Sequence, residues 1–262
     1  MERAVELFVA GWTETSLVDV LGEVSFTIWF CGCDFRCPWC QNKSVVLGTA
    51  CRRVRLSEVL EAISNASLLS DYVQATGGEP ALQPEGLRAL FKACKEMGMK
   101  TSLDTNGSRE WVVRGLLEAG LVDHLAMDVK APLSDPAKYG RVSGLKADVA
   151  ERMVRSVRAS LEKALEMAPF LEIRTTFVPT LHEKADLVEI ASELVKMGLT
   201  DRERAYYVIQ QFSPRGDLID PSFANVRQPL ADELLELARE VKETTGLKVV
   251  FVRTQERGVI RA

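Results

Sequence analysis

The sequence predicts an α/β fold, a partial (β/α)6 barrel of the TIM type with parallel strands. Short runs rich in β-branched and aromatic residues alternate with longer amphipathic stretches. Several of the amphipathic stretches end at glycine, a common stop signal of helices. Strands that alternate with helices form parallel sheets. A doubly wound open sheet fits the same alternation, and both architectures bind ligands at the carboxyl ends of the strands.

The expected strands are short, apolar and rich in β-branched and aromatic residues. They are 25–30, 72–76, 101–103, 124–129, 172–178, 206–212 and 248–252. We expect the last of them to close an edge of the sheet. The expected helices carry apolar residues at helical spacing. They are 56–66, 84–97, 111–119, 148–167, 185–197 and 230–245.

Length and composition are those of one globular unit. The chain has 262 residues, of which 47% are hydrophobic and 27% charged. We expect a single domain over 1–262, with its core at about 20–215 and a C-terminal helix and edge strand at 229–253. The first 20 or so residues would lead into the barrel. A net charge of −4 argues against binding to nucleic acid through bulk positive charge.

The N-terminal segment predicts neither a signal peptide nor a membrane anchor. Glu2, Arg3 and Glu6 interrupt its apolar residues. No uncharged run approaches the ~18 apolar residues that a transmembrane helix needs. We therefore expect a cytoplasmic protein with reduced thiols, in which clustered cysteines act as metal ligands or catalytic groups rather than as disulfides.

A cluster of cysteines follows the first expected strand. Cys33, Cys37 and Cys40 have the spacing Cx3CxxC. Structural zinc requires four ligands, and Cys31 or Cys51 is available as the fourth, so a zinc site in a non-catalytic module stays open. A [4Fe-4S] cluster is the favoured interpretation, because three thiolates leave one iron free to bind a substrate. Otherwise, we expect Cys31 and Cys51 to be inert.

Polar residues also follow the later strands, where a barrel enzyme keeps its active site. Gly77-Gly78-Glu79 comes directly after the second expected strand. Glycines let the backbone approach a ligand closely, and Glu79 can accept hydrogen bonds from an ammonium group. The other polar residues at or near strand ends are Asp104, Thr105, Asp128, Lys130, Arg174, Gln210 and Gln211.

Cx3CxxC after a first strand, with Gly-Gly-Glu after the second, resembles the radical S-adenosylmethionine superfamily. The resemblance implies a radical oxidoreductase with one [4Fe-4S] cluster, whose unique iron binds S-adenosylmethionine, and reductive cleavage to a 5′-deoxyadenosyl radical. Within the superfamily the chain is most similar to glycyl-radical enzyme activating proteins, in particular those of anaerobic ribonucleoside-triphosphate reductase. The similar stretches are Phe30–Asn42, Thr76–Gln83, Leu103–Gly107, Val122–Pro132, Glu172–His182 and Tyr206–Pro214.

The resemblance implies roles for individual residues. Cys33, Cys37 and Cys40 would hold the cluster. The residues expected to contact S-adenosylmethionine are Trp39, Gln41, Gly77, Gly78, Glu79, Asp104, Asp128, Lys130, Arg174 and Gln211. Positions that hold a monovalent cation in pyruvate formate-lyase activases correspond to Asp104, Thr105, Met127 and Asp128. The sequence departs from the family at Gln41 and near Gln211, where the family often has histidine.

The resemblance also implies partners. A glycyl-radical enzyme would be the protein substrate, and flavodoxin or ferredoxin the electron donor. Segment 43–71 holds only Cys51, so no second cluster is expected. Neither a membrane nor nucleic acid is an expected partner. The alternatives are a radical enzyme acting on a small molecule or a modified nucleoside, for example in deazapurine synthesis, and a metal-binding module without catalytic activity.

Overall fold

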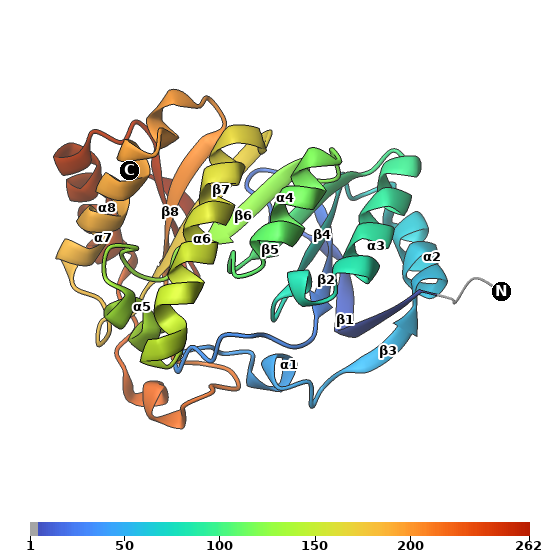
Figure 1. The fold of residues 1–262 in the computed structure, drawn as a ribbon, viewed down its shortest axis with the longest axis horizontal. Helices are drawn as coiled ribbons and strands as arrows, with labels where there is room; N and C mark the ends of the chain where they lie inside the picture. Colours follow the sequence, from blue (N-terminus) through green and yellow to red (C-terminus); the bar gives the residue numbers. More distant parts are fainter. Residues whose placement is uncertain (1–4) are drawn as a thin grey trace.

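The computed structural model describes residues 5–262, in which one ten-stranded sheet carries its helices on one face (Figure 1). The strand order is β10-β9-β8-β7-β6-β5-β4-β2-β1-β3. The strands are β1 Glu6–Ser16, β2 Ser25–Phe30, β3 Arg52–Arg55, β4 Tyr72–Gly77, β5 Lys100–Thr105, β6 His124–Asp128, β7 Phe170–Phe177, β8 Ala205–Gln211, β9 Val250–Thr254 and β10 Gly258–Arg261. The helices are α1 Lys43–Val46, α2 Leu56–Ala66, α3 Pro84–Glu96, α4 Glu110–Glu118, α5 Pro136–Ser143, α6 Ala147–Met167, α7 Lys184–Lys196 and α8 Ala231–Thr245.

The middle of the sheet is parallel, as the alternation of strands and helices predicts. Strands β2, β4, β5, β6, β7 and β8 pair in parallel as the six strands expected of the barrel, and β9, the strand expected at 248–252, is a seventh parallel strand. Their carboxyl ends therefore meet at one edge of the sheet, and the polar residues that follow each strand can gather there. Among residues 5–262 no helix has the length and apolarity that crossing a bilayer requires.

Three antiparallel strands were not expected from the sequence. The first 20 or so residues were expected to lead into the barrel, without a strand of their own. Instead they contain β1, which pairs with β2 on one side and β3 on the other. The strand expected at 248–252 is β9, but it does not close the edge, because β10 pairs antiparallel beyond it. β3 has the sequence RRVR with only Val54 buried, so it carries no apolar run that marks it as a strand.

A buried carboxylate joins three parts of the chain inside the barrel. Glu172 on β7 is fully buried and accepts hydrogen bonds from the guanidinium of Arg253 on β9 (3.0 Å) and the backbone N–H of Leu21 (3.2 Å). Its Oε1 lies 3.2 Å from His124 Nε2. Burial opposes its charge, but the hydrogen bond from His124 and the charges of His124 and Arg253 outweigh burial and lower the pKa of Glu172 to about 2. Glu172 therefore ties the loop after β1 and strand β9 to the sheet.

Replacing this carboxylate should destabilise the fold. We expect Glu172→Ala to lower the free energy of unfolding by about 3–5 kcal/mol, because it leaves Arg253 buried without its partner. The matched control is Glu166→Ala, which removes an exposed ion pair with Lys163 on α6 and should change the free energy little. Denaturant unfolding measures both, and an equal small loss in the two variants would contradict this role of Glu172.

Candidate active site

A cavity of about 610 Å³ opens at the carboxyl ends of the parallel strands. It brings together almost every residue that the sequence singled out from β2, β4, β5, β6, β7 and β8. The expected site residues that line it are Cys33, Cys37, Trp39, Cys40, Gln41, Gly77, Gly78, Asp104, Thr105, Asp128, Lys130, Arg174 and Gln211. Glu79 and Met127 do not line it, and Met127 is fully buried in the core between sheet and helices.

The loop that carries the three cysteines is packed on helix α5. The backbone N–H of Arg36 donates to Ser143 O (2.9 Å), and the indole N–H of Trp39 donates to Val142 O (2.9 Å). Gly144 ends α5 in the left-handed region, with φ +67°, and a Cβ there would lie 1.9 Å from Arg36 O. The cysteine loop therefore depends on a helix that the sequence analysis did not predict.

The three cysteines are free thiols, and their burial disfavours the thiolate form unless a metal ion compensates the negative charge. Burial raises the pKa of Cys37 to about 12 and also raises the pKa values of Cys33 and Cys40. Buried thiols lose their protons when metal ions compensate the negative charge. Among residues 5–262 no three Cys, His, Asp or Glu side chains gather as they would around a single ion. Cysteine thiolates are the ligands that hold [4Fe-4S] clusters, so these three residues suit such a cluster.

No fourth Cys or His ligand is left in residues 5–262. Cys31 and Cys51 form a disulfide, which corrects the expectation that they are free and inert thiols. Cys94 lies on α3 and is fully buried. His124 contacts Ser102 and Glu172, and His182 bonds the backbone at Val178 N and Lys130 O. The described residues therefore fit a cluster held by three cysteines with one iron open, and not a closed zinc site.

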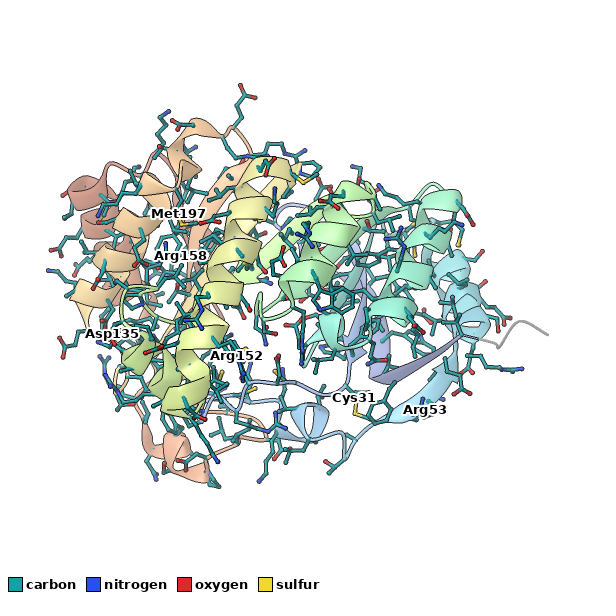
Figure 2. All side chains as sticks on the ribbon, in the orientation of Figure 1. Cys31, Arg53, Asp135, Arg152, Arg158 and Met197 are labelled. Carbon is teal, nitrogen blue, oxygen red and sulfur yellow. A yellow bond between two sulfur atoms is a disulfide. The ribbon has the colours of Figure 1, made fainter. Side chains whose placement is uncertain are left out.

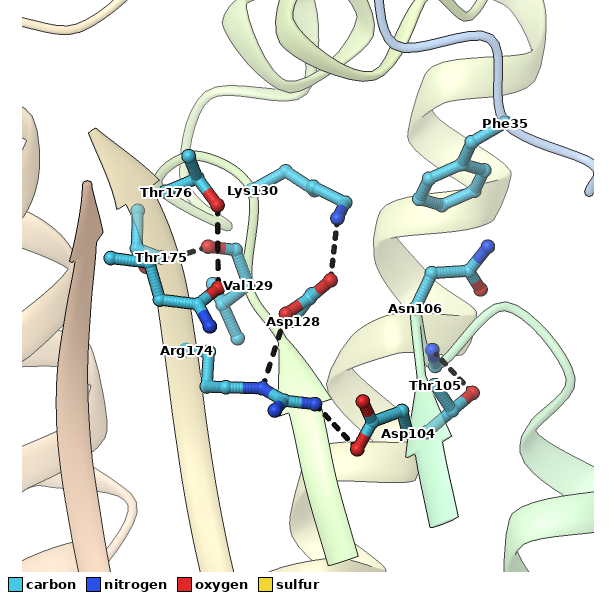
Figure 3. Close-up of polar contacts among 12 residues, drawn as sticks. Phe35, Asp104, Thr105, Asn106, Asp128, Val129, Lys130, Arg174, Thr175 and Thr176 are labelled. Carbon is cyan, nitrogen blue, oxygen red and sulfur yellow. Dashed lines mark hydrogen bonds and ion pairs between the residues drawn. The ribbon is translucent and has the colours of Figure 1, made fainter. Parts of the chain in front are cut away.

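Four charged residues form an alternating chain across the cavity (Figure 3). Arg174 lies 2.6 Å from Asp104 and 3.6 Å from Asp128, and Lys130 donates to Asp128 (2.7 Å). Burial opposes the charge on Asp128, but Lys130 and Arg174 outweigh it and lower the pKa of Asp128. The Nζ of Lys130 also lies 5.3 Å from the ring centre of Trp39. The two cations are thus held in place beside the cysteine loop.

Glu79 faces away from the cavity and holds two loops together. Its carboxylate accepts hydrogen bonds from Ala81 N (3.0 Å), Thr105 Oγ1 (2.9 Å) and Asn106 N (2.7 Å). Burial raises the pKa of Glu79 to about 7, although these hydrogen bonds oppose the shift. Asn106 in turn extends its amide toward Cys33 Sγ (3.7 Å). In the structure Glu79 therefore positions Asn106, a residue that the sequence analysis did not assign to the site.

Two further residues of the wall differ from expectation. Gln211 uses its side chain to bond Pro229 O (2.8 Å) and Gln255 N (2.9 Å), so it braces the turn between β9 and β10. Arg253, on β9, lines the cavity and was not predicted. A charged residue within an apolar strand was the signal that singled out Arg174, and the same signal could have identified Arg253.

The paired glycines after β4 allow two backbones to touch. A Cβ at Gly78 would lie 2.0 Å from Gly32 O, and a Cβ at Gly77, where φ is +115°, would lie 2.4 Å from Phe30 O. The backbone N–H of Gly78 donates to Phe30 O (2.8 Å). The loop after β4 therefore lies directly against the loop that carries the cysteines.

The chain belongs to the radical SAM superfamily, whose sequence profile matches residues 27–194. A provisionally named glycyl-radical enzyme activating enzyme of Methanocaldococcus jannaschii is 29% identical over 239 residues, which cover 91% of this chain and 93% of that protein. The 7-carboxy-7-deazaguanine synthase of Hyperthermus butylicus is 27% identical over 227 residues, covering 79% and 92%. The crystal structure of QueE from Escherichia coli aligns over 95% of both chains with a TM-score of 0.57 at 16% identity, which confirms the predicted barrel. Membership of the superfamily implies a [4Fe-4S] cluster and S-adenosylmethionine.

A methyl group at Gly78 should separate the two loops. We expect Gly78→Ala to lower the free energy of unfolding by about 1–3 kcal/mol, because the backbone oxygen of Gly32 cannot turn aside as a side chain can. In the control Gly115→Ala the new Cβ on α4 meets nothing within 4 Å, and the variant should gain about 0.5–1 kcal/mol from its helix. Denaturant unfolding separates the two, and a stable Gly78→Ala would contradict the close approach.

The buried carboxyl of Glu79 should make stability depend on pH. Its pKa rises from 4.5 to about 7 on folding, so the folded protein holds this proton more tightly than the unfolded chain. Wild type should therefore lose stability relative to Glu79→Gln as pH rises from 4.5 to about 7, and the difference should be constant outside that range. Unfolding free energies of both proteins across this range give the difference, and a flat difference would disprove the raised pKa.

Proposed function

We propose that this protein is a glycyl-radical enzyme activating enzyme. It would take a hydrogen atom from a glycine of a partner protein, using S-adenosylmethionine bound at a [4Fe-4S] cluster on Cys33, Cys37 and Cys40. Support comes from the Methanocaldococcus relative, which is similar over nearly its whole length. The ion pairs in the cavity wall are the observation that favours a protein substrate over an anionic small molecule.

The cations in the cavity wall already have partners. Each Lys or Arg that lines the cavity in the described part of the chain faces a carboxylate, in the pairs Lys130–Asp128 (2.7 Å), Arg174–Asp104 (2.6 Å) and Arg253–Glu172 (3.0 Å). If Lys130 and Arg174 bind the carboxylate of S-adenosylmethionine, a further anionic substrate is left only with Arg253, whose charge Glu172 already balances. A neutral peptide segment needs no such cation, so the pairing favours a protein substrate.

The wall opposite the cysteines suits a peptide main chain. Its polar side chains are amides and hydroxyls, which can donate to a carbonyl or accept from an N–H. They are Thr176, Gln210, Ser213, Thr254 and Gln255. The Nε–H of Arg253 is buried with no hydrogen-bond partner among residues 5–262.

The chain's own residues would orient the cofactor. When bound, the cluster and S-adenosylmethionine supply the radical. Lys130 and Arg174 would bind the methionine carboxylate, and Trp39 would cover the ligand beside Lys130. We also propose a monovalent cation beside that carboxylate, at Asp104, Thr105, Met127 and Asp128, with Met127 contributing its backbone because its side chain is buried in the core. Flavodoxin or ferredoxin would deliver the electron.

A second candidate function is the synthesis of a carboxylated deazapurine. The Hyperthermus relative favours it, since that synthase is similar over 92% of its own length. The named product of that enzyme carries a carboxyl group, for which the wall of this cavity offers no unpaired cation among the described residues. The charge pairing therefore places this function second.

Anaerobic reconstitution should distinguish the two functions. The protein with cluster, S-adenosylmethionine and a reductant is mixed with a glycyl-radical protein of the same organism. We expect deoxyadenosine together with a doublet in the electron paramagnetic resonance spectrum of the partner. Cys37→Ser should abolish both signals, because it removes a cluster ligand. Formation of 7-carboxy-7-deazaguanine, without a doublet on the partner, would support the synthase instead.

A further inference from the structure

The disulfide between Cys31 and Cys51 closes a ring around the cluster ligands. The two cysteines are 20 residues apart in sequence, and Cys33, Cys37 and Cys40 all lie between them. Cys31 precedes the first ligand by two residues and lies at the end of the molecule that carries α1 and β3 (Figure 2). The covalent ring therefore contains the whole cysteine loop and little else.

Both ends of the ring rest on the same strand. The backbone N–H of Cys31 donates to Phe8 O on β1 (3.0 Å), and Arg52, which follows Cys51, pairs with Val9 on β1. Between these ends the chain leaves the sheet and returns through α1. The disulfide adds a covalent link to the hydrogen bonds that hold this base, among them Gly32 N–H to Val45 O (3.0 Å) and Glu79 N–H to Gly32 O (2.7 Å).

Besides its packing on α5, the ring is joined to the segment at Asp217 by hydrogen bonds. Lys43 N donates to Asp217 O and Ser44 N to the Asp217 carboxylate, both at 2.9 Å. These bonds lie at the surface, where water competes with them. The part of the ring at Lys43 and Ser44 can therefore loosen by breaking exposed hydrogen bonds, and the disulfide limits how far the end at Cys51 can then move.

We propose that Cys31 and Cys51 form a redox-sensitive clamp on the loop that holds the iron–sulfur cluster. In the closed form the disulfide joins the two ends of the loop. A dithiol reductant opens it in two steps. One thiolate of the reductant attacks Sγ of Cys51, which forms a mixed disulfide and releases Cys31. The second thiol of the reductant then attacks the reductant's own sulfur in that mixed disulfide and releases Cys51. Two electrons and two protons pass to the cysteines, which become thiols, and the reductant becomes a disulfide.

The difference in burial between the two sulfurs decides which of them a reductant's thiolate attacks first. Cys31 is 3% exposed, whereas Cys51 is only partly buried. Attack on Cys51 leaves the thiol of Cys31 as the leaving group inside the protein. The reverse reaction, with a small-molecule or protein disulfide as oxidant, closes the clamp again. This inference requires a cluster on the three cysteines but does not depend on which substrate the enzyme acts on.

The first experiment counts thiols. The holoprotein is denatured anaerobically in iodoacetamide without reductant, and its mass is measured. Four alkylated cysteines are expected, namely Cys33, Cys37, Cys40 and Cys94, because Cys31 and Cys51 are bonded to each other. Six alkylated cysteines in freshly purified protein would overturn the proposal.

The second experiment measures how firmly the loop holds iron. Anaerobic holoprotein is mixed with an iron chelator, with and without prior treatment with dithiothreitol, and loss of visible absorbance gives the release rate. We expect treatment to speed release by about tenfold in wild type, well within the limit of roughly 300-fold by which closing a loop of this length restricts its open states. Cys94→Ser, which removes a thiol outside the ring, should behave as wild type.

The double variant separates the clamp from other effects of the reductant. Cys31→Ser/Cys51→Ser should release iron as fast as reduced wild type and should not respond to dithiothreitol. An equal acceleration by dithiothreitol in this variant would show that the reductant acts on the cluster itself and would overturn the proposal. Suppose that dithiothreitol treatment yields six thiols in wild type, so that the disulfide is reduced, but leaves the rate of iron release unchanged. That result alone would overturn the proposal.

Discussion

Two backbone hydrogen bonds between neighbouring loops set the position of the cysteine loop. The N–H of Gly78 donates to Phe30 O (2.8 Å) and that of Glu79 to Gly32 O (2.7 Å). Side chains larger than hydrogen at Gly77 or Gly78 would part these backbones. Since Gly32 directly precedes the first cluster ligand, the ends of β2 and β4 are held together at the point where the cluster would bind.

From this contact the arrangement extends to the next strand. Glu79 turns inward because its backbone is already bound to Gly32, and its carboxylate then holds the backbone of Asn106 after β5. Asn106 reaches back to Cys33. Three successive strand ends are thus connected in a closed circuit of hydrogen bonds. Such a circuit holds the ligand-binding groups in place before any ligand arrives, which reduces the ordering that binding must bring about.

The sequence was sufficient to predict features that depend on local pattern. The parallel strands, the three cysteines and most of the cavity wall follow from periodicity and from motif positions at strand ends. Features that depend on a distant partner were not predictable in this way. Glu79 was expected to meet a ligand, and only the fold shows that Thr105 and Asn106 take up its carboxylate. Likewise, β3 is a strand because β1 lies beside it, and its own residues carry no strand pattern.

The disulfide was missed for a related reason. The expectation of free thiols came from the compartment that the sequence suggests, whereas pairing depends on two loop ends that meet on β1. A low-potential electron donor and a disulfide are compatible in one protein, because the two reductions use different chemistry. The proposed flavodoxin or ferredoxin would pass one electron at a time through its own cofactor, not by thiol–disulfide exchange with Cys51. Exchange with a dithiol needs an in-line approach to a partly buried sulfur and two electrons. If both proposals hold, the cysteine loop would receive single electrons for catalysis while its clamp would respond separately to the thiol–disulfide balance around the protein.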